Sequence, residues 1–232
     1  MSELDVMTTQ VTATDVPLEH REPVEYYSIL TETSKHVTFI DCPHEVDAVV
    51  RILEVLAGNL DRFRTRPRVS TVVTAASPLQ VDGTALDVHV ALAGYGVPIF
   101  VYSMTIAGAT CPVTLAGTVA RSVTEFLGIA TALQVASPGA RLIFCFGSGV
   151  LDMSRTTFSL GCVESGLMGV AATEVGHYLG VPMLNPGLST DAKHAGVQAG
   201  YEKALKALTI CGGAAGRGLG LGGSSTRTTP CR

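Results

Sequence analysis

The sequence predicts an α/β fold in which parallel strands alternate with helices. Short runs rich in β-branched residues recur along the chain, and each is followed by a longer segment with apolar residues at helical spacing. This alternation is typical of βαβ units with right-handed crossovers. Five strands can be assigned. The sheet is therefore either open, as in a doubly wound fold, or part of a (β/α) barrel, which has eight strands.

The predicted strands are short, apolar and continuous, as expected for strands buried on both faces. They span residues 36–40, 69–75, 98–103, 141–146 and 181–184. The predicted helices, placed by apolar spacing and by their start and stop residues, span residues 43–57, 82–94, 114–134, 162–179 and 195–208. The side chains of the last helix that are expected to face inward are Val197, Tyr201, Ala204, Leu205 and Leu208.

Composition divides the chain into three parts. Residues 1–34 are polar and rich in Thr and Glu, which indicates an N-terminal arm or an edge segment. Residues 35–210 carry the strand and helix patterns and form the domain. Residues 211–232 are rich in Gly, Ser and Thr without an apolar period, which predicts a disordered tail.

Charge argues against a nucleic-acid partner. The net charge is -4, and phosphate binding needs clustered Lys and Arg. One short basic segment contains Arg62, Arg64, Arg66 and Arg68 at alternating positions. We interpret it as a solvated turn before a strand, with a basic patch as the alternative.

The same composition argues against a membrane or secreted protein. Residues 88–120 contain no charged side chain, but prolines and glycines interrupt the run, so it fits a buried strand and a packed helix better than a membrane span. The six cysteines form no CxxC pair and read as free thiols of a reducing compartment, which predicts a cytoplasmic protein. No His or Cys spacing suggests a metal site.

A glycine-rich segment after the fourth strand suggests one alternative function. Gly147-Ser-Gly149 begins like a dinucleotide-binding loop, but Asp152 occupies the position of the third glycine. A carboxylate there would repel a pyrophosphate. A nucleotide-binding open α/β domain therefore remains a weaker alternative.

Polar and aromatic residues gather where the predicted strands end, which is the active-site face of a (β/α) barrel. Each has an ordinary explanation as a cap or a core residue, but as a group on one face they suggest a binding site. They are Ser77, Tyr102, Ser103, Met104, Gly147, Ser148, Asp152, Asn185, Asp191 and Lys193, with Glu164, Gln198 and Glu202 on the helices behind.

Several segments resemble the trimethylamine methyltransferase family, which includes glycine-betaine type members. The resemblance covers roughly residues 65–208, and two of the segments are specific. The matching segments are Ser77-Pro-Leu79, Gly108-Ala-Thr-Cys-Pro-Val-Thr-Leu-Ala-Gly117, Glu125-Phe-Leu-Gly-Ile129, Ser137-Pro-Gly139, Leu151-Asp-Met153, Tyr178-Leu-Gly-Val-Pro182, Thr190-Asp-Ala-Lys193 and Gln198-Ala-Gly-Tyr-Glu-Lys203.

The resemblance implies a (β/α)8 TIM barrel, incomplete here, with about five to six βα units. It also implies transfer of a methyl group from a small methylated amine to the cobalt of a separate corrinoid protein. The corrinoid would be carried by that partner and no cofactor bound directly. The pyrrolysine of the family's trimethylamine enzymes lies downstream of the last matching segment. Association into a homo-oligomer is also expected, because a partial barrel exposes apolar strand edges.

Given this resemblance, the chemistry suggests roles for the residues at the strand ends. A methylated ammonium needs aromatic faces or carboxylates around it. We expect Asp152, Asp191 and Lys193 to act in catalysis. The residues expected to bind substrate are Tyr102, Phe146, Phe158, Glu164, Gln198 and Glu202. An inactive barrel fragment is the remaining alternative.

Overall fold

The computed structural model describes residues 6–8, 14–39 and 46–213, and its main element is a curled sheet of parallel strands. Neighbouring strands in this sheet are all parallel. In spatial order the strands are β1 (Val6–Thr8), β2 (His36–Phe39), β3 (Val69–Thr74), β4 (Ile99–Ser103), β6 (Leu142–Phe146) and β9 (Met183–Leu184).

The spatial order of the strands decides between the two predicted folds. A doubly wound sheet reverses its strand order at a switch point, whereas a (β/α) barrel adds each strand beside the previous one. Here the order along the sheet is the order along the chain. The fold is therefore a half-barrel of TIM-barrel type with six βα units, in agreement with the predicted five to six.

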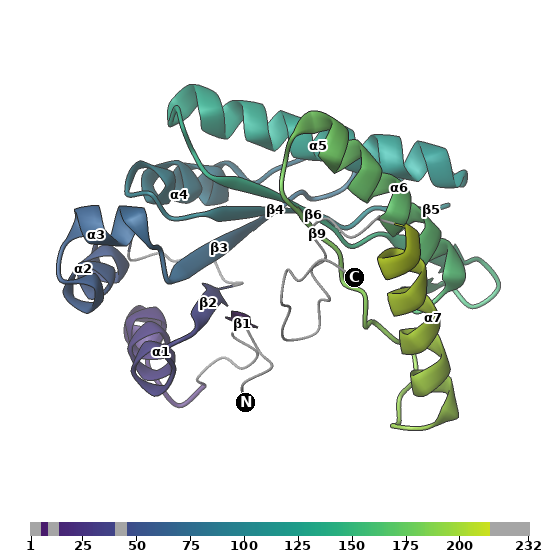
Figure 1. Cartoon of the computed structure of the whole chain (residues 1–232), viewed down its shortest axis with the longest axis horizontal. Coiled ribbons are helices and arrows are strands. Elements are labelled where there is room, and N and C mark those ends of the chain that lie inside the picture. The colour runs from purple at the N-terminus through teal and green to yellow at the C-terminus, as the bar shows by residue number, and fades with distance from the viewer. Residues whose placement is uncertain (1–5, 9–13, 40–45, 214–232) are drawn as a thin grey trace.

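The helices follow the convex side of the curled sheet from α1 round to α7 (Figure 1). Their bounds are α1 (Leu18–Glu32), α2 (Val46–Ala57), α3 (Leu60–Thr65), α4 (Gly83–Gly94), α5 (Leu115–Ala136), α6 (Val163–Leu179) and α7 (Val197–Gly213). The predicted helix starts are confirmed where a cap is present: the side chains of Asp82 and Thr114 accept hydrogen bonds from Ala85 N and Gly117 N.

Along the central strands, successive side chains point alternately toward the helices and toward the concave side of the sheet. In β4, Ile99 and Val101 are buried in the main core, whereas Phe100 and Tyr102, which alternate with them, are only partly buried. The Phe144 ring of β6 stacks on Phe126 of α5 with ring centroids 4.6 Å apart. The apolar contact between sheet and helices thus supplies most of the buried surface, and the concave side is less covered.

The N-terminal part is more ordered than the sequence predicted. The predicted arm contains an edge strand, β1, and a helix, α1, whose Tyr26 stacks on Phe39 of β2 with ring centroids 3.5 Å apart. Tyr26 and Leu30 are almost fully buried in a second core cluster. Strand β1 fits the predicted edge segment, whereas α1 was missed because two large apolar residues one turn apart are a weak helical signal in a polar segment.

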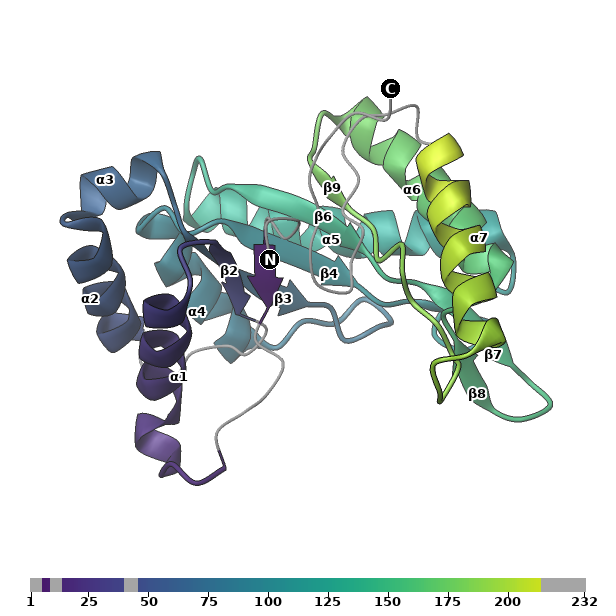
Figure 2. The same ribbon diagram turned by 60° about the horizontal axis from the view of Figure 1, so that its bottom comes forward.

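A second, three-stranded sheet lies beyond the carboxyl ends of β4 and β6, next to the lower end of α7 (Figure 2). It consists of β5 (Ile106–Ala107), β7 (Gly149–Asp152) and β8 (Thr157–Ser159). β5 pairs in parallel with β7, which forms a hairpin with β8. The sequence did not predict these strands because each has only two to four residues.

The predicted inward face of the last helix is wrong. In α7, Val197, Tyr201 and Leu208 are 91%, 66% and 71% exposed, whereas Lys206 and Ile210 are 3% and 0% exposed. The helix packs against α6 through the side that carries Lys206 and Ile210 (Figure 2). Apolar spacing alone identified a stripe that the described residues leave uncovered.

The structure describes only the start of the predicted tail but all of the uncharged run of residues 88–120. Helix α7 continues to Gly213, three residues into the predicted tail, and the rest of the tail lies outside the described residues. The uncharged run of residues 88–120 forms part of α4, β4, β5 and the start of α5. Among the helices of residues 14–39 and 46–213, none combines the length and the apolarity that crossing a membrane requires.

The two faces of α7 give a direct test. Replacing the fully buried Ile210 by Ala should lower the free energy of unfolding by about 2–5 kcal/mol, as for other large-to-small core changes. Leu208→Ala on the exposed stripe is the matched control and should change it by less than about 0.5 kcal/mol. Urea denaturation followed by circular dichroism measures both. Equal losses would contradict the observed orientation of the helix.

Candidate functional site

A buried carboxylate joins the carboxyl ends of β3 and β4. The Glu125 side chain, 4% exposed on α5, accepts hydrogen bonds from Ser77 Oγ (2.9 Å) and Ser103 Oγ (2.8 Å). Its other oxygen accepts a bond from Leu79 N at 3.1 Å. Three neutral donors thus satisfy one buried charge, which would be costly without partners. Glu125 fixes the loop after β3 relative to the end of β4.

Two aromatic rings lie against the Gly147-Ser-Gly149 segment. A side chain at Gly147 would collide with the Tyr102 ring, and one at Gly149 with the backbone oxygen of Ser159 and the Phe158 ring. The glycines are therefore explained by close packing. The segment continues into strand β7, so it lacks the helix N-terminus that a dinucleotide loop provides. This geometry does not support the nucleotide-binding alternative.

Tyr102 is the predicted aromatic residue best placed at the site. It lies on the concave side at the carboxyl end of β4, opposite Cys145 of β6 in the strand register. Burial raises the pKa of its phenol to about 12, with a smaller contribution from Cys145. The ring is therefore neutral at physiological pH.

Behind this segment lies a cluster of buried hydroxyl groups. Thr105 Oγ1 is 2.7 Å from both Ser122 Oγ and Ser148 Oγ, which are 3.0 Å from each other. Ser165 Oγ donates to the backbone oxygen of Ser148 at 2.7 Å. All four side chains are at most 2% exposed. The cluster joins β4, α5, β6 and α6 and leaves Ser148 inaccessible to a ligand.

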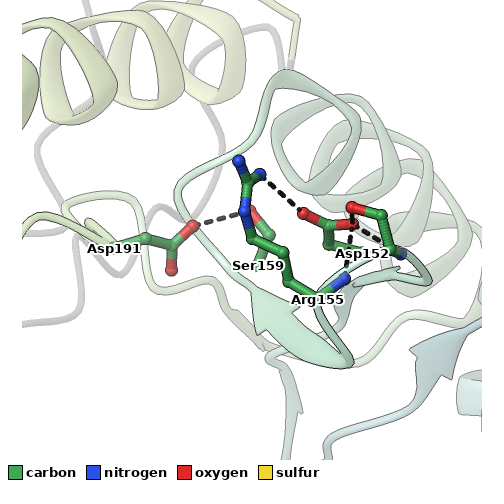
Figure 3. Close-up of polar contacts among 5 residues, drawn as sticks. Asp152, Arg155, Ser159 and Asp191 are labelled. Atoms are coloured by element: carbon green, nitrogen blue, oxygen red, sulfur yellow. Dashed lines mark hydrogen bonds and ion pairs between the residues drawn. The ribbon is translucent and has the colours of Figure 1, made fainter.

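Asp191 holds the loop that leads into α6. Its carboxylate accepts hydrogen bonds from Ser159 Oγ (2.6 Å), Leu160 N (3.0 Å) and Gly161 N (3.0 Å), and Figure 3 shows the contact with Ser159. All three donors come from β8 and the turn after it. In this arrangement Asp191 anchors the hairpin, and its predicted catalytic role stays a prediction.

Glu202 continues the same network from α7. Its carboxylate accepts bonds from Thr190 Oγ1 (2.6 Å), Asp191 N (2.8 Å) and Gln198 Nε2 (2.7 Å). The hydrogen bond from Thr190, followed by those from Gln198 and Asp191, lowers the pKa of this carboxyl group below its usual value. A side chain at Gly161 would meet the Glu202 carboxylate. The predicted Gln198 and Glu202 therefore converge with Asp191.

Lys206 is a buried cation that the sequence analysis did not single out. Its side chain is 3% exposed, and Nζ donates to the backbone oxygen of Leu160 at 2.9 Å. Burial lowers the pKa of its ammonium group to about 8, although Cys162 and Asp191 act in the opposite direction. Lys206 and Asp191 thus hold the same loop from two sides.

Asp152 lies apart, at the end of β7 where the turn to β8 begins. It accepts hydrogen bonds from Ser154 Oγ (2.7 Å) and Ser154 N (2.9 Å) and forms an ion pair with Arg155 at 3.2 Å (Figure 3). The bonds from Ser154 are the main cause of a pKa below the usual value. These are the contacts of a turn-forming residue.

The side chains of the remaining predicted residues do not converge on one site. Phe146 is 1% exposed in the core between sheet and helices, which gives it a packing role. Glu164, exposed in the first turn of α6, has the sign that favours a helix N-terminus. Lys193 is exposed in the segment before α7.

Glu125 is the principal residue that sequence reasoning missed. A signal was available, because Glu125 falls on the same helical stripe as Ser122, Ile129 and Leu133, all of them buried. A carboxylate on the buried side of an otherwise apolar helix indicates a partner on the sheet. Among the described residues, no group of His, Cys, Asp and Glu is arranged to hold a metal ion.

The fold and these strand-end loops define a class of protein: a (β/α)-barrel chain with a polar site at the carboxyl ends of its strands. The sequence profile of the trimethylamine methyltransferase (MTTB) family matches residues 1–216. The chain therefore belongs to this family. The match also includes the N-terminal part that lay outside the resemblance seen in the sequence.

Curated relatives agree with this assignment. Trimethylamine methyltransferase MttB1 of Methanosarcina mazei is 30% identical over 208 residues, which is 88% of this chain and 42% of that protein. Trimethylamine methyltransferase MttB of Desulfitobacterium hafniense is 31% identical over 80% of this chain and 38% of its own length. A glycine betaine methyltransferase of D. hafniense is 30% identical over 67% of this chain and 33% of its own length. The chain thus spans about two fifths of the trimethylamine methyltransferases it matches.

Removing the Glu125 carboxylate should destabilise the site. In Glu125→Ala, Ser77 Oγ, Ser103 Oγ and Leu79 N lose their acceptor, so we expect a loss of about 2–5 kcal/mol of unfolding free energy. Glu125→Gln, which keeps one acceptor oxygen, should lose less. Glu174→Ala on α6, an exposed glutamate, is the control. An unchanged urea midpoint for Glu125→Ala would contradict the role of Glu125 in fixing the loop after β3 to the end of β4.

The lowered pKa of Lys206 predicts that the free energy of unfolding depends on pH. The folded-state pKa of about 8 lies below the usual 10.5, so between these pH values the unfolded chain binds the proton and the folded chain does not. Wild-type stability should therefore rise with pH over this window relative to Lys206→Met, by at most about 3 kcal/mol. Urea melts at pH 7, 9 and 10.5 measure the difference. Lys203→Met, on the exposed side of α7, should run parallel to the wild type.

Proposed function

We propose that this chain takes part in transferring a methyl group from a methylated amine to the cobalt of a corrinoid protein. The amine would be trimethylamine or a quaternary amine such as glycine betaine. The observation that carries the proposal is the family match over residues 1–216, supported by relatives named as methyltransferases of both amines.

The transfer of the methyl group requires few functional groups from the protein. In the transfer a C–N bond breaks, the amine leaves with the electron pair of that bond, and the methyl carbon bonds to cobalt. A quaternary amine leaves without a proton transfer, so the protein must mainly orient and desolvate it. Trimethylamine must carry a proton on its nitrogen to leave as neutral dimethylamine. The corrinoid, held by its own protein, would supply the nucleophile. The residues of this chain would bind and position the amine.

Tyr102 is the residue we assign to cation binding. It lies on the concave side at the strand ends, where barrel active sites lie. Because burial raises its pKa to about 12, its ring stays a neutral phenol that can attract a methylammonium without forming an ion pair. The close packing of Gly147 against the ring would fix its orientation.

Glu125, Asp191 and Glu202 would act as positioning residues. Hydroxyl and amide donors occupy the carboxylate oxygens of each, so their charge is used to hold loops. Glu125 fixes the loop after β3, and the Asp191–Glu202 pair fixes the loop before α6. Substrate would then meet a preformed rim with Tyr102 on it.

An anaerobic absorbance assay of cob(I)alamin methylation tests the reaction class. Purified chain with a native circular dichroism spectrum would be given trimethylamine, glycine betaine, carnitine or proline betaine. Methylcobalamin formation from one donor is expected and would name the substrate. Folded protein that turns over none of them would favour the inactive-fragment alternative.

A Tyr102→Leu variant tests the binding role within the same experiment. It should weaken binding of glycine betaine more than that of its carbon isostere 3,3-dimethylbutyrate, by roughly 0.5–2 kcal/mol for the lost cation–π contact. Calorimetric titration of both ligands measures this difference. The exposed Tyr178→Leu is the control. Equal losses for both ligands would remove Tyr102 from the cation site.

A further inference from the structure

A cavity of about 470 Å³ lies at the end of the sheet opposite the candidate site. It is bordered by α1, α2, α3 and residues 66–69, which lead into the amino end of β3. Residues 69–74 of β3 separate this end from the loop that Glu125 holds, which is a distance of about 20 Å along the strand. The cavity is therefore independent of the proposed amine site.

The inner wall of the cavity is apolar. Leu30, Leu53, Phe63 and Val69 line it, and each is at most 4% exposed. These side chains belong to the second core cluster, so the wall is packed from behind. A volume of this size is typical of small-molecule sites and would accommodate a short apolar group.

Arginine side chains supply the polar part of the lining. Arg62, Arg66 and Arg68 border the cavity, and no carboxylate is among the described residues that line it. Arg68 donates from Nη2 to the backbone oxygen of Thr33 at 2.7 Å, but its buried Nε has no partner within the described part of the chain. Among the described residues that line the cavity, the three guanidinium groups have no counter-charge, so they repel one another, and an unsatisfied buried donor is costly.

Arg64 lies in the same segment but differs in its contacts from the three arginines that line the cavity. Arg64 forms an ion pair with Asp61 at 3.5 Å, donates to the backbone oxygen of Gly94 and does not line the cavity. A position in the last turn of α3 would explain Arg62 and Arg64 by the helix dipole alone. The dipole also favours Arg66 at the C-cap of α3, but it does not explain Arg68, whose buried Nε has no partner in the described part of the chain.

We propose that this cavity, termed the arginine pocket, binds a small organic anion with a carboxylate or phosphate head and a short apolar chain. The head would lie between the guanidinium groups of Arg62, Arg66 and Arg68, which match such oxygens in geometry and charge. The apolar chain would lie against Leu30, Leu53 and Phe63. The proposal corresponds to the basic-patch alternative for Arg62, Arg66 and Arg68, whereas Arg64, paired with Asp61, lies outside the pocket.

Isothermal titration of the chain with hexanoate and hexyl phosphate tests the pocket and separates the two head groups. At least one of them should bind, more tightly than inorganic phosphate or hexylamine, and binding should weaken as salt is raised. Arg66→Ala and Arg62→Ala should each weaken binding by about tenfold, the change expected for one lost charge-assisted hydrogen bond. Both residues are exposed, so these variants should fold, which circular dichroism would verify.

Arg64→Ala is the matched control because it removes the same charge from the same segment outside the pocket. It should change affinity by less than about twofold, since its charge is already paired with Asp61. An equal loss in Arg64→Ala, equal binding of hexylamine, or no binding of either anion would overturn the proposal. The readout is binding, so it is independent of methyl transfer.

Discussion

Parallel pairing in chain order is the constraint on which the rest of this structure depends. A parallel pair of strands needs a crossover, and right-handed crossovers between successive neighbours place every helix on the same side of the sheet. The helices therefore cover the convex side, where Phe126 packs on Phe144. The loops after the strands all emerge at one end. This geometry brings Ser77, Ser103 and Tyr102 to one rim although they are distant in sequence.

The rim is held mainly by carboxylates that accept hydrogen bonds from neutral donors. Glu125 and Asp191 each accept three hydrogen bonds from neutral hydroxyl and amide groups. Such donors fix direction more strictly than an ion pair with a long side chain, because serine hydroxyls and backbone amides have little freedom to move. Lys206 adds a cation whose partner is a backbone oxygen. The loops around the proposed amine site are thus preorganised, as binding and orientation of a methylated amine would require.

The two ends of the half-barrel carry different chemistry. The carboxyl end has a neutral phenol, hydroxyl groups and hydrogen-bonded carboxylates, whereas the amino end has the arginine pocket, with no carboxylate among the described residues that line it. The first suits a methylated cation and the second an anion. Strand β3 runs from one end to the other, so ligands at the two ends would not compete for the same residues. The exposed apolar stripe of α7 is a third surface, and its side chains are not needed to hold α7 on α6.

The sequence by itself determined the strand–helix alternation, five of the six strands of the main sheet with the helices that follow them, and the family. These follow from local patterns: β-branched runs, apolar spacing, caps such as Asp82, and specific segments such as Gln198-Ala-Gly-Tyr-Glu-Lys203. Tertiary structure alone decided the strand order, which distinguishes a half-barrel from an open sheet. It also decided which face of α7 is buried and which polar residues meet. Asp152 and Asp191 look alike in sequence, yet one closes a turn and the other anchors a loop 30 to 32 residues away. The physical reason is that hydrogen-bond partners and burial depend on contacts between distant segments, which no local pattern encodes.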